Sequence, residues 1–313
     1  MSNLPSYHNA QRMQSKASIV IEGMPGSGKS GLALLLAKTL AGSWDKVAAI
    51  DTENRSLDLF EGLNLSDGEL CEPFQKVDLQ AEYGYTPSNY IALREEAIKN
   101  GALALVNDSI SHAWVGAGGV LEQVSVLEAN NAKLNKFNAW GQPDIMHEKS
   151  LLTEMFRCPD IHVISTVRVK EKFVMKTGEG IESQGEQQIY QADAKYEPDL
   201  LLRMVAPGTP DGAAPQAKVI KTRYAILRKN EVYAFTPELL KQIKEYLAEG
   251  ADPAILIERQ RKDLAVSLND ILKNDASKQT AFRMLKKKMN VDTAIKLADM
   301  TLDQLQYLFT QLA

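Results

Sequence analysis

Cysteine is scarce in this chain of 313 residues. Its two cysteines, Cys71 and Cys158, belong to no CxxC pair and no Cys/His cluster. We therefore expect neither a disulfide framework nor a zinc site, and this cysteine usage fits the reducing cytosol. Long apolar runs are absent too, because no stretch approaches the roughly 20 residues that span a bilayer. The polar first 16 residues lack the apolar centre of a signal peptide. We expect a soluble cytoplasmic protein with no membrane contact.

Basic residues are not in excess either. The chain has 36 Lys and Arg against 40 Asp and Glu, a net charge of −4, so any contact with nucleic acid must come from a local basic patch. The most basic run is FRMLKKKMN at 282–290. A solvated helix face is one interpretation of this run, and an electrostatic contact with DNA phosphates or an acidic partner is the other.

Short β-rich runs alternate with helical patterns up to residue 235. Several runs are continuously apolar, which is typical of parallel strands buried on both faces. They predict an α/β fold whose mostly parallel sheet is flanked by helices, with an antiparallel addition late in the chain. The strand-like segments are 17–22, 46–53, 102–109, 160–169, 199–205 and 217–227.

From Thr236 onward the pattern is helical, with Thr236 as an N-cap and Pro237 at the first helical position. Apolar residues then recur at helical spacing to the end of the chain. Two earlier segments, 176–188 and 206–216, have loop-like compositions. The predicted organisation is a tail at 1–15, an α/β core at 16–235 and a small C-terminal helical module at 236–313.

The strongest motif is GMPGSGKS at 23–30, which lies between the strand-like ASIVIE and a leucine-rich helical run. In a GxxxxGK[ST] loop, backbone amides and the helix N-terminus surround phosphate oxygens. Lys29 would reach the β- and γ-phosphates, and Ser30 would ligate Mg²⁺. A glycine-rich turn without function is the competing interpretation. The motif predicts ATP and Mg²⁺ binding by Gly23, Pro25, Gly26, Ser27, Gly28, Lys29, Ser30 and Gly31.

Carboxylates follow two further strand-like segments. Asp108 ends the segment at 102–109 and is predicted to hold Mg²⁺ through water, although a solvated strand end is the plainer alternative. Asp51 and Glu53 end the segment at 46–53, where ligands bind in open α/β sheets. Residues i and i+2 of a strand share a face, so both could approach the site if the strand continues that far. We choose Glu53 as the catalytic group because it lies farther out; the alternative is that both cap the next segment.

These motifs in combination resemble the RecA-like ATPase core: IDTENRSLDLF at 50–60, VNDS at 106–109 and VISTVRVKEK at 163–172. More closely, the chain resembles the phage-encoded RecA-like ATPases related to single-strand annealing proteins. The run from Phe137 to Phe173 and the later KTR at 221–223 are typical of that group. The resemblance covers roughly residues 15–235.

The resemblance implies a role for each matching position. Glu53 matches the catalytic glutamate, and Thr166 occupies the polar sensor position after the fourth strand, where many relatives carry glutamine. The segment 176–188 lies where the DNA-binding loop falls. Lys221 and Arg223 match two cations that reach the nucleotide of a neighbouring subunit, which implies a homo-oligomer with nucleotide at its interface.

Physical chemistry also favours a cation supplied by a neighbour, because phosphoryl transfer develops negative charge. Lys221 and Arg223 are two apart in a strand-like segment and would point the same way. The planar guanidinium of Arg223 suits phosphate better. A solvated strand face with two ordinary cations is the alternative interpretation.

The leading hypothesis is an ATP-hydrolysing RecA-like protein that acts on single-stranded DNA in phage-type recombination or annealing, with a phage recombination or replication partner, in the cytoplasm of a bacterial host. The alternative is a nucleotide-switched P-loop protein that binds a protein partner without a direct DNA role. A small-molecule phosphotransferase is disfavoured, because no acceptor site or arginine-rich lid is evident. His112, Trp114 and Trp140 are predicted to be packing residues.

Overall fold

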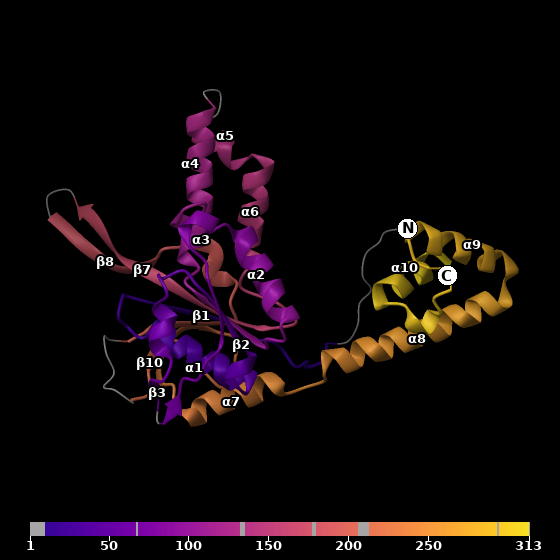
Figure 1. Ribbon diagram of the computed structural model, residues 1–313, viewed down its shortest axis with the longest axis horizontal. Coiled ribbons are helices and arrows are strands. Elements are labelled where there is room, and N and C mark those ends of the chain that lie inside the picture. Colours follow the sequence, from indigo (N-terminus) through magenta and orange to yellow (C-terminus); the bar gives the residue numbers. More distant parts are fainter. Residues whose placement is uncertain are drawn as a thin grey trace. The chain divides into compact units, whose positions relative to one another are not determined.

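The computed structural model describes residues 10–66, 68–131, 135–176, 180–205, 213–292 and 294–312 (Figure 1). The chain divides into two compact units, Ser15–Ala248 and a second unit that joins the N-terminal residues up to Gln14 with Glu249–Ala313. The sequence placed this division at residue 236. The structure instead keeps α7 (Pro237–Ala248) in the first unit, because its buried Leu240, Ile243 and Leu247 join the core around α1.

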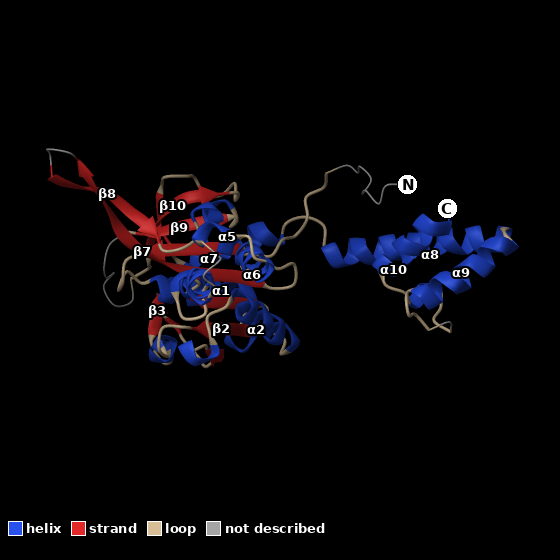
Figure 2. Ribbon diagram, turned by 90° about the horizontal axis from the view of Figure 1, so that it is seen from above, coloured by secondary structure: helices blue, strands red, loops and turns tan. Residues whose placement is uncertain are grey.

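The first unit is built on a sheet that has nine strands among the described residues, in the order β11-β10-β9-β1-β7-β6-β2-β5, with β8 paired to β7. Neighbours from β9 to β5 are parallel, whereas β8, β10 and β11 pair antiparallel. The predicted α/β fold with a mostly parallel sheet flanked by helices is confirmed (Figure 2). The strands are β1 (Ser18–Gly23), β2 (Val47–Asp51), β5 (Gln75–Asp78), β6 (Ala104–Asp108), β7 (His162–Lys176), β8 (Gly180–Gln188), β9 (Leu200–Met204), β10 (Gln216–Thr222) and β11 (Val232–Ala234).

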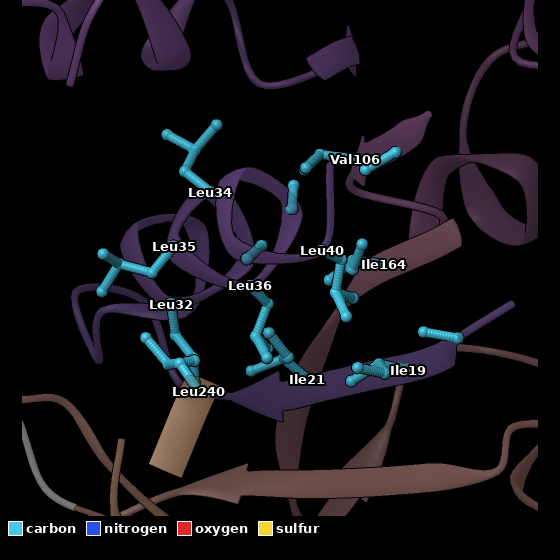
Figure 3. Packing of buried hydrophobic residues seen from close by; sticks show 14 of the residues in the cluster. Ile19, Ile21, Leu32, Leu34, Leu35, Leu36, Leu40, Val106, Ile164 and Leu240 are labelled. Atoms are coloured by element: carbon cyan, nitrogen blue, oxygen red, sulfur yellow. The ribbon is translucent and has the colours of Figure 1, made fainter. Parts of the chain in front are cut away.

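Both faces of the sheet are buried, as the continuous apolar runs predicted. In β1, Ile19 and Ile21 belong to a cluster with α1 (Lys29–Ala41), whereas Val20 belongs to the cluster on the other face. Figure 3 shows Leu36 of α1 pointing toward Ile21. Full burial of such a side chain stabilises the fold by about 1.5–3 kcal/mol. This core fixes the start of α1 against the carboxyl end of β1.

The remaining helices of this unit cover the opposite face or extend from it. Residues of α2, α3 and α6 contribute to the second buried cluster. Val124, Ala139 and Ile145 form a separate small cluster, which holds α4, α5 and α6 together (Figure 1). The helices are α2 (Pro87–Lys99), α3 (Ser111–Val115), α4 (Val120–Asn130), α5 (Lys136–Trp140) and α6 (Pro143–Glu154), and a two-stranded sheet is formed by β3 (Asn64–Ser66) and β4 (Glu69–Leu70).

The second unit contains α8 (Pro253–Asn274), α9 (Ala276–Lys288) and α10 (Leu302–Leu312). Its own small core includes Leu268, Leu305 and Leu308, all fully buried. The basic run at 282–290 lies on α9 and the turn that follows it. None of the helices in the described ranges is long and apolar enough to cross a membrane.

Candidate nucleotide-binding site

The glycine-rich loop connects the carboxyl end of β1 to the first residue of α1. Gly26 and Gly28 have φ angles of +72° and +86°, which residues with a side chain rarely adopt. A Cβ atom at Gly23 would lie 2.7 Å from Ser27 Oγ, which is too close without a shift. The first turn of α1 carries no acidic residue, so the positive end of the helix is not neutralised locally. The loop therefore fits an anion such as phosphate.

The other residues predicted to bind phosphate differ in how strongly their surroundings restrict the side chain at that position. Ser27 is buried, and its Oγ has no hydrogen-bond partner in the described part of the chain. Pro25 is exposed at the tip of the loop. A Cβ atom at Gly31 would be in ordinary contact with Phe60 at 3.5 Å, so steric fit alone does not demand glycine there.

Lys29, at the first position of α1, directs its ammonium group back over the loop. Its Nζ donates a hydrogen bond to the Met24 carbonyl oxygen at 2.9 Å. Burial lowers the pKa of Lys29, and nearby Asp108 and Glu53 oppose this effect. The ammonium thus lies at the loop together with two carboxylates from other strands.

Asp108 ends β6 and is 2% exposed. Thr166 of the adjacent strand β7 donates a hydrogen bond to Asp108 Oδ1. Asp108 Oδ2 is buried and has no hydrogen-bond partner among the described residues. Burial raises the pKa of Asp108, while the nearby Ser30 and Thr166 hydroxyls lower it less strongly. An unpartnered buried carboxylate oxygen beside a lysine and a serine is suited to a cation.

Asp51 and Glu53 have different surroundings. Asp51 is buried and accepts hydrogen bonds from the backbone amides of Glu53 (2.7 Å) and Leu57 (2.9 Å), which is the capping role considered from the sequence. Glu53 lies beyond the end of β2, and its carboxylate pairs with Arg168 of β7. Ser109 Oγ donates to Glu53 Oε1 at 3.0 Å. Burial alone would raise the pKa of Glu53, but the Arg168 guanidinium and the Ser109 hydroxyl lower it overall.

A buried polar network fixes the turn after β6. Thr52 Oγ1 accepts a hydrogen bond from the Ser109 backbone amide at 2.9 Å and lies 2.7 Å from His112 Nδ1. The Tyr90 hydroxyl donates to the Ser109 carbonyl at 2.8 Å. The His112 ring stacks on Tyr85 with centroids 4.8 Å apart. This packing holds Ser109 where it reaches Glu53.

Lys221 and Arg223 lie away from the loop of their own chain. Thr222, between them, pairs with Leu200, which in turn pairs with Ile19 near the amino end of β1, whereas the loop follows the carboxyl end. Strand β10 ends at Thr222, so the strand-face argument does not extend to Arg223. Arg223 Nη1 donates to Asp199 at 2.7 Å, and Lys221 Nζ donates to the Tyr196 carbonyl.

The segment 176–188, expected as a loop, largely forms strand β8, which pairs with the far end of β7. Figure 1 shows this hairpin extending from the sheet. Residues 177–179 lie outside the described residues, as does most of 206–216, the other expected loop. The hairpin is a direct continuation of the strand that carries Thr166 and Arg168.

The residues at the loop also fit a magnesium ion. Ser30 and Asp108 are the side chains that could hold it, directly or through water. The described residues include no group of three or more His, Cys, Asp or Glu arranged for a metal. Mg²⁺ is commonly held by one or two side chains together with waters and substrate phosphates.

Sequence reasoning brought Lys29, Ser30, Asp108, Glu53 and Thr166 to one edge of the sheet, and the structure places them together. It missed the contribution of Arg168, although this residue lies in the same strand-like segment as Thr166, VISTVRVKEK at 163–172. Thr52 and Ser109 were also missed, although both adjoin predicted site residues. Comparison of the sequence with protein-family models and with curated proteins finds no match.

Proposed function

We propose that this chain binds Mg²⁺–ATP in the loop from Gly23 to Gly31 and hydrolyses it. The observation that carries the proposal is the unpartnered Oδ2 of buried Asp108, which lies with Ser30 and Lys29 at the start of α1. Lys29 would neutralise the β- and γ-phosphates, while Ser30 and Asp108 would hold Mg²⁺. Bound Mg²⁺ neutralises charge that develops on the phosphate oxygens.

Glu53 is the candidate for orienting or deprotonating the attacking water. It lies just beyond the end of β2, and Thr166 comes from β7, which lies between β1 and β6 in the sheet. Thr166 is fully buried and holds Asp108 in place. In this proposal Thr166 acts on the phosphates through Asp108.

We further propose that the ATPase belongs to a RecA-like assembly that acts on single-stranded DNA. Support comes from the sequence resemblance and from the β7–β8 hairpin, which continues the strand that carries Arg168. Lys221 and Arg223 could serve a nucleotide only in another subunit, because they lie at the other end of their own sheet. Phage-type recombination or annealing is the process that this arrangement would serve.

The alternative is a nucleotide-switched protein that binds a protein partner without acting on DNA. It is favoured by the pairing of Glu53 with Arg168, which occupies the carboxylate that hydrolysis would require. Slow hydrolysis would suit a switch.

ATP turnover measured with and without single-stranded DNA separates the two hypotheses. Stimulation by single-stranded DNA but not by duplex of the same sequence is the expected result. An equal rate in both conditions favours the switch. Lys29→Ala, prepared in parallel, controls for contaminating ATPases, because it should have no turnover in either condition.

A further inference from the structure

The ion pair between Arg168 and Glu53 occupies both oxygens of the proposed catalytic carboxylate. Arg168 Nε donates to Oε1 at 2.7 Å, and Nη2 pairs with Oε2. The Ser109 hydroxyl adds a third hydrogen bond, to Oε1 at 3.0 Å. Such charge-assisted bonds stabilise the ionised carboxylate and make it a weaker base. Glu53 is thus held in a form poorly suited to activate water.

Arg168 itself lies beside the phosphate loop. In the register of β1 and β7, its direct partner is Gly23, the first glycine of the loop. Its positive charge contributes to lowering the pKa of Lys29. Its side chain is 41% exposed, in contrast to the fully buried Thr166 two residues earlier. Arg168 is therefore a partly exposed cation beside the loop, within reach of an incoming phosphate.

The backbone of Arg168 is fixed by hydrogen bonds, while its guanidinium contacts the Glu53 carboxylate. The Arg168 amide donates to Ser111 Oγ at 2.9 Å, and its carbonyl accepts from the Ile189 amide at 2.8 Å. Among the residues that the structure describes, the guanidinium contacts only the Glu53 carboxylate. Arg168 could exchange Glu53 for another partner by rotation of its own side chain, without movement of the strand.

We propose that Arg168 is a latch that responds to the terminal phosphate of a nucleoside triphosphate. The planar guanidinium fork matches carboxylate and phosphate equally well. When a triphosphate occupies the loop, Arg168 exchanges Glu53 for the γ-phosphate, and the released carboxylate can engage water. A diphosphate offers no such group, so Arg168 stays on Glu53. This inference rests on the proposed nucleotide site.

The test compares Mg²⁺–ATP and Mg²⁺–ADP binding in Glu53→Gln and in the double variant Glu53→Gln/Arg168→Ala. The Glu53→Gln background slows hydrolysis and removes repulsion between an unpaired Glu53 and the γ-phosphate. Loss of Arg168 should weaken ATP binding by roughly 10-fold or more, because a hydrogen-bonded charge pair is lost. ADP affinity should change less than about 2-fold, which also shows that the double variant is folded. Glu53→Gln/Arg168→Lys should recover only part of the ATP affinity, because an ammonium lacks the fork.

The matched control is Glu53→Gln/Arg228→Ala, since Arg228 is an exposed arginine paired with Glu231 at 3.7 Å. It should leave both affinities unchanged. Equal weakening of ATP and ADP by Arg168→Ala, or no change in either, would overturn the latch while leaving the nucleotide site intact. Failure of the parent protein to bind either nucleotide would overturn the latch and the proposed function together.

Discussion

The two ends of the sheet carry charges in contrasting environments. At the carboxyl end, Lys29 and Asp108 are partly or fully buried, burial shifts the pKa of each, and one Asp108 oxygen has no partner. At the amino end, Arg157 and Arg223 share the carboxylate of Asp199, at 2.5 and 2.7 Å. Their side chains are about half exposed, at 47% and 53%.

This contrast separates a ligand site from an exchangeable surface contact. Buried polar atoms without partners reduce stability, so they are retained where a ligand uses them. Arg157 also pairs with Asp199, so this carboxylate would keep a partner if Arg223 turned to the nucleotide of a neighbouring subunit.

The largest expected effect is that of Lys29→Ala, compared with Lys221→Ala at the other end of the sheet. Lys29→Ala should abolish turnover and weaken ATP binding, because it removes the cation nearest the β- and γ-phosphates. Lys221→Ala is the matched variant, and it should bind ATP nearly as the parent does while turning it over more slowly. Titration calorimetry and a steady-state ATPase assay measure the two properties. Normal turnover by Lys29→Ala would refute the site assignment.

Arg223→Ala tests whether the amino end serves another subunit. Turnover should fall by about 10-fold or more with ATP binding retained, because a transition-state contact is lost. Specific activity of the parent protein should rise with protein concentration as subunits associate.

Mixing two variants tests whether Arg223 of one subunit serves the nucleotide site of another. Glu53→Gln alone should lower turnover by roughly 10²-fold, because the amide cannot act as a base. In a mixed assembly, an Arg223→Ala subunit keeps its Glu53 and borrows Arg223 from a Glu53→Gln neighbour, so activity should partly recover. A monomer with a concentration-independent rate would contradict the shared site and leave Lys221 and Arg223 as an ordinary surface.

Local patterns were enough to predict the main strands and the glycine-rich turn between β1 and α1. The apolar run around Ile19 is buried on both faces, and Asp108 ends its strand as expected. Asp51 and Glu53 could share a strand face only if the strand continued to Glu53, but β2 ends at Asp51 and Asn54 then adopts a φ of +56°. Tight turns of this kind need a backbone conformation that composition alone does not reveal.

Contacts between residues far apart in the chain also could not be predicted from the sequence. The partner of Glu53 is 115 residues away, and no local pattern connects it to Arg168. Strand β8 was missed because its polar sequence, GIESQGEQQ, lacks the alternation that marks a half-buried strand. The amphipathic pattern predicted helix α7, but not that Leu240 would pack with α1 in the first unit.

Asp108→Asn should give the smallest effect. It should increase the stability of the fold but weaken nucleotide binding. Burial raises the pKa of Asp108, so its contribution to stability is present below the unfolded pKa and lost as pH rises through the folded pKa. At neutral pH the raised pKa of Asp108 therefore reduces the free energy of unfolding. Removing the charge should raise the melting temperature at pH 7 and make little difference near about pH 3, below the ordinary aspartate pKa.

The same substitution should weaken Mg²⁺-dependent ATP binding, because the amide replaces a negatively charged ligand. Saturating Mg²⁺–ATP should thus raise the melting temperature of the parent more than that of Asp108→Asn, which reverses their order of stability. Asp199→Asn provides the comparison from the amino end of the sheet: it leaves Arg157 and Arg223 without a carboxylate and should not gain stability at pH 7. A gain in both variants would mean that net charge, rather than the buried position of Asp108, controls the effect, and the distinction between the two ends of the sheet would fail.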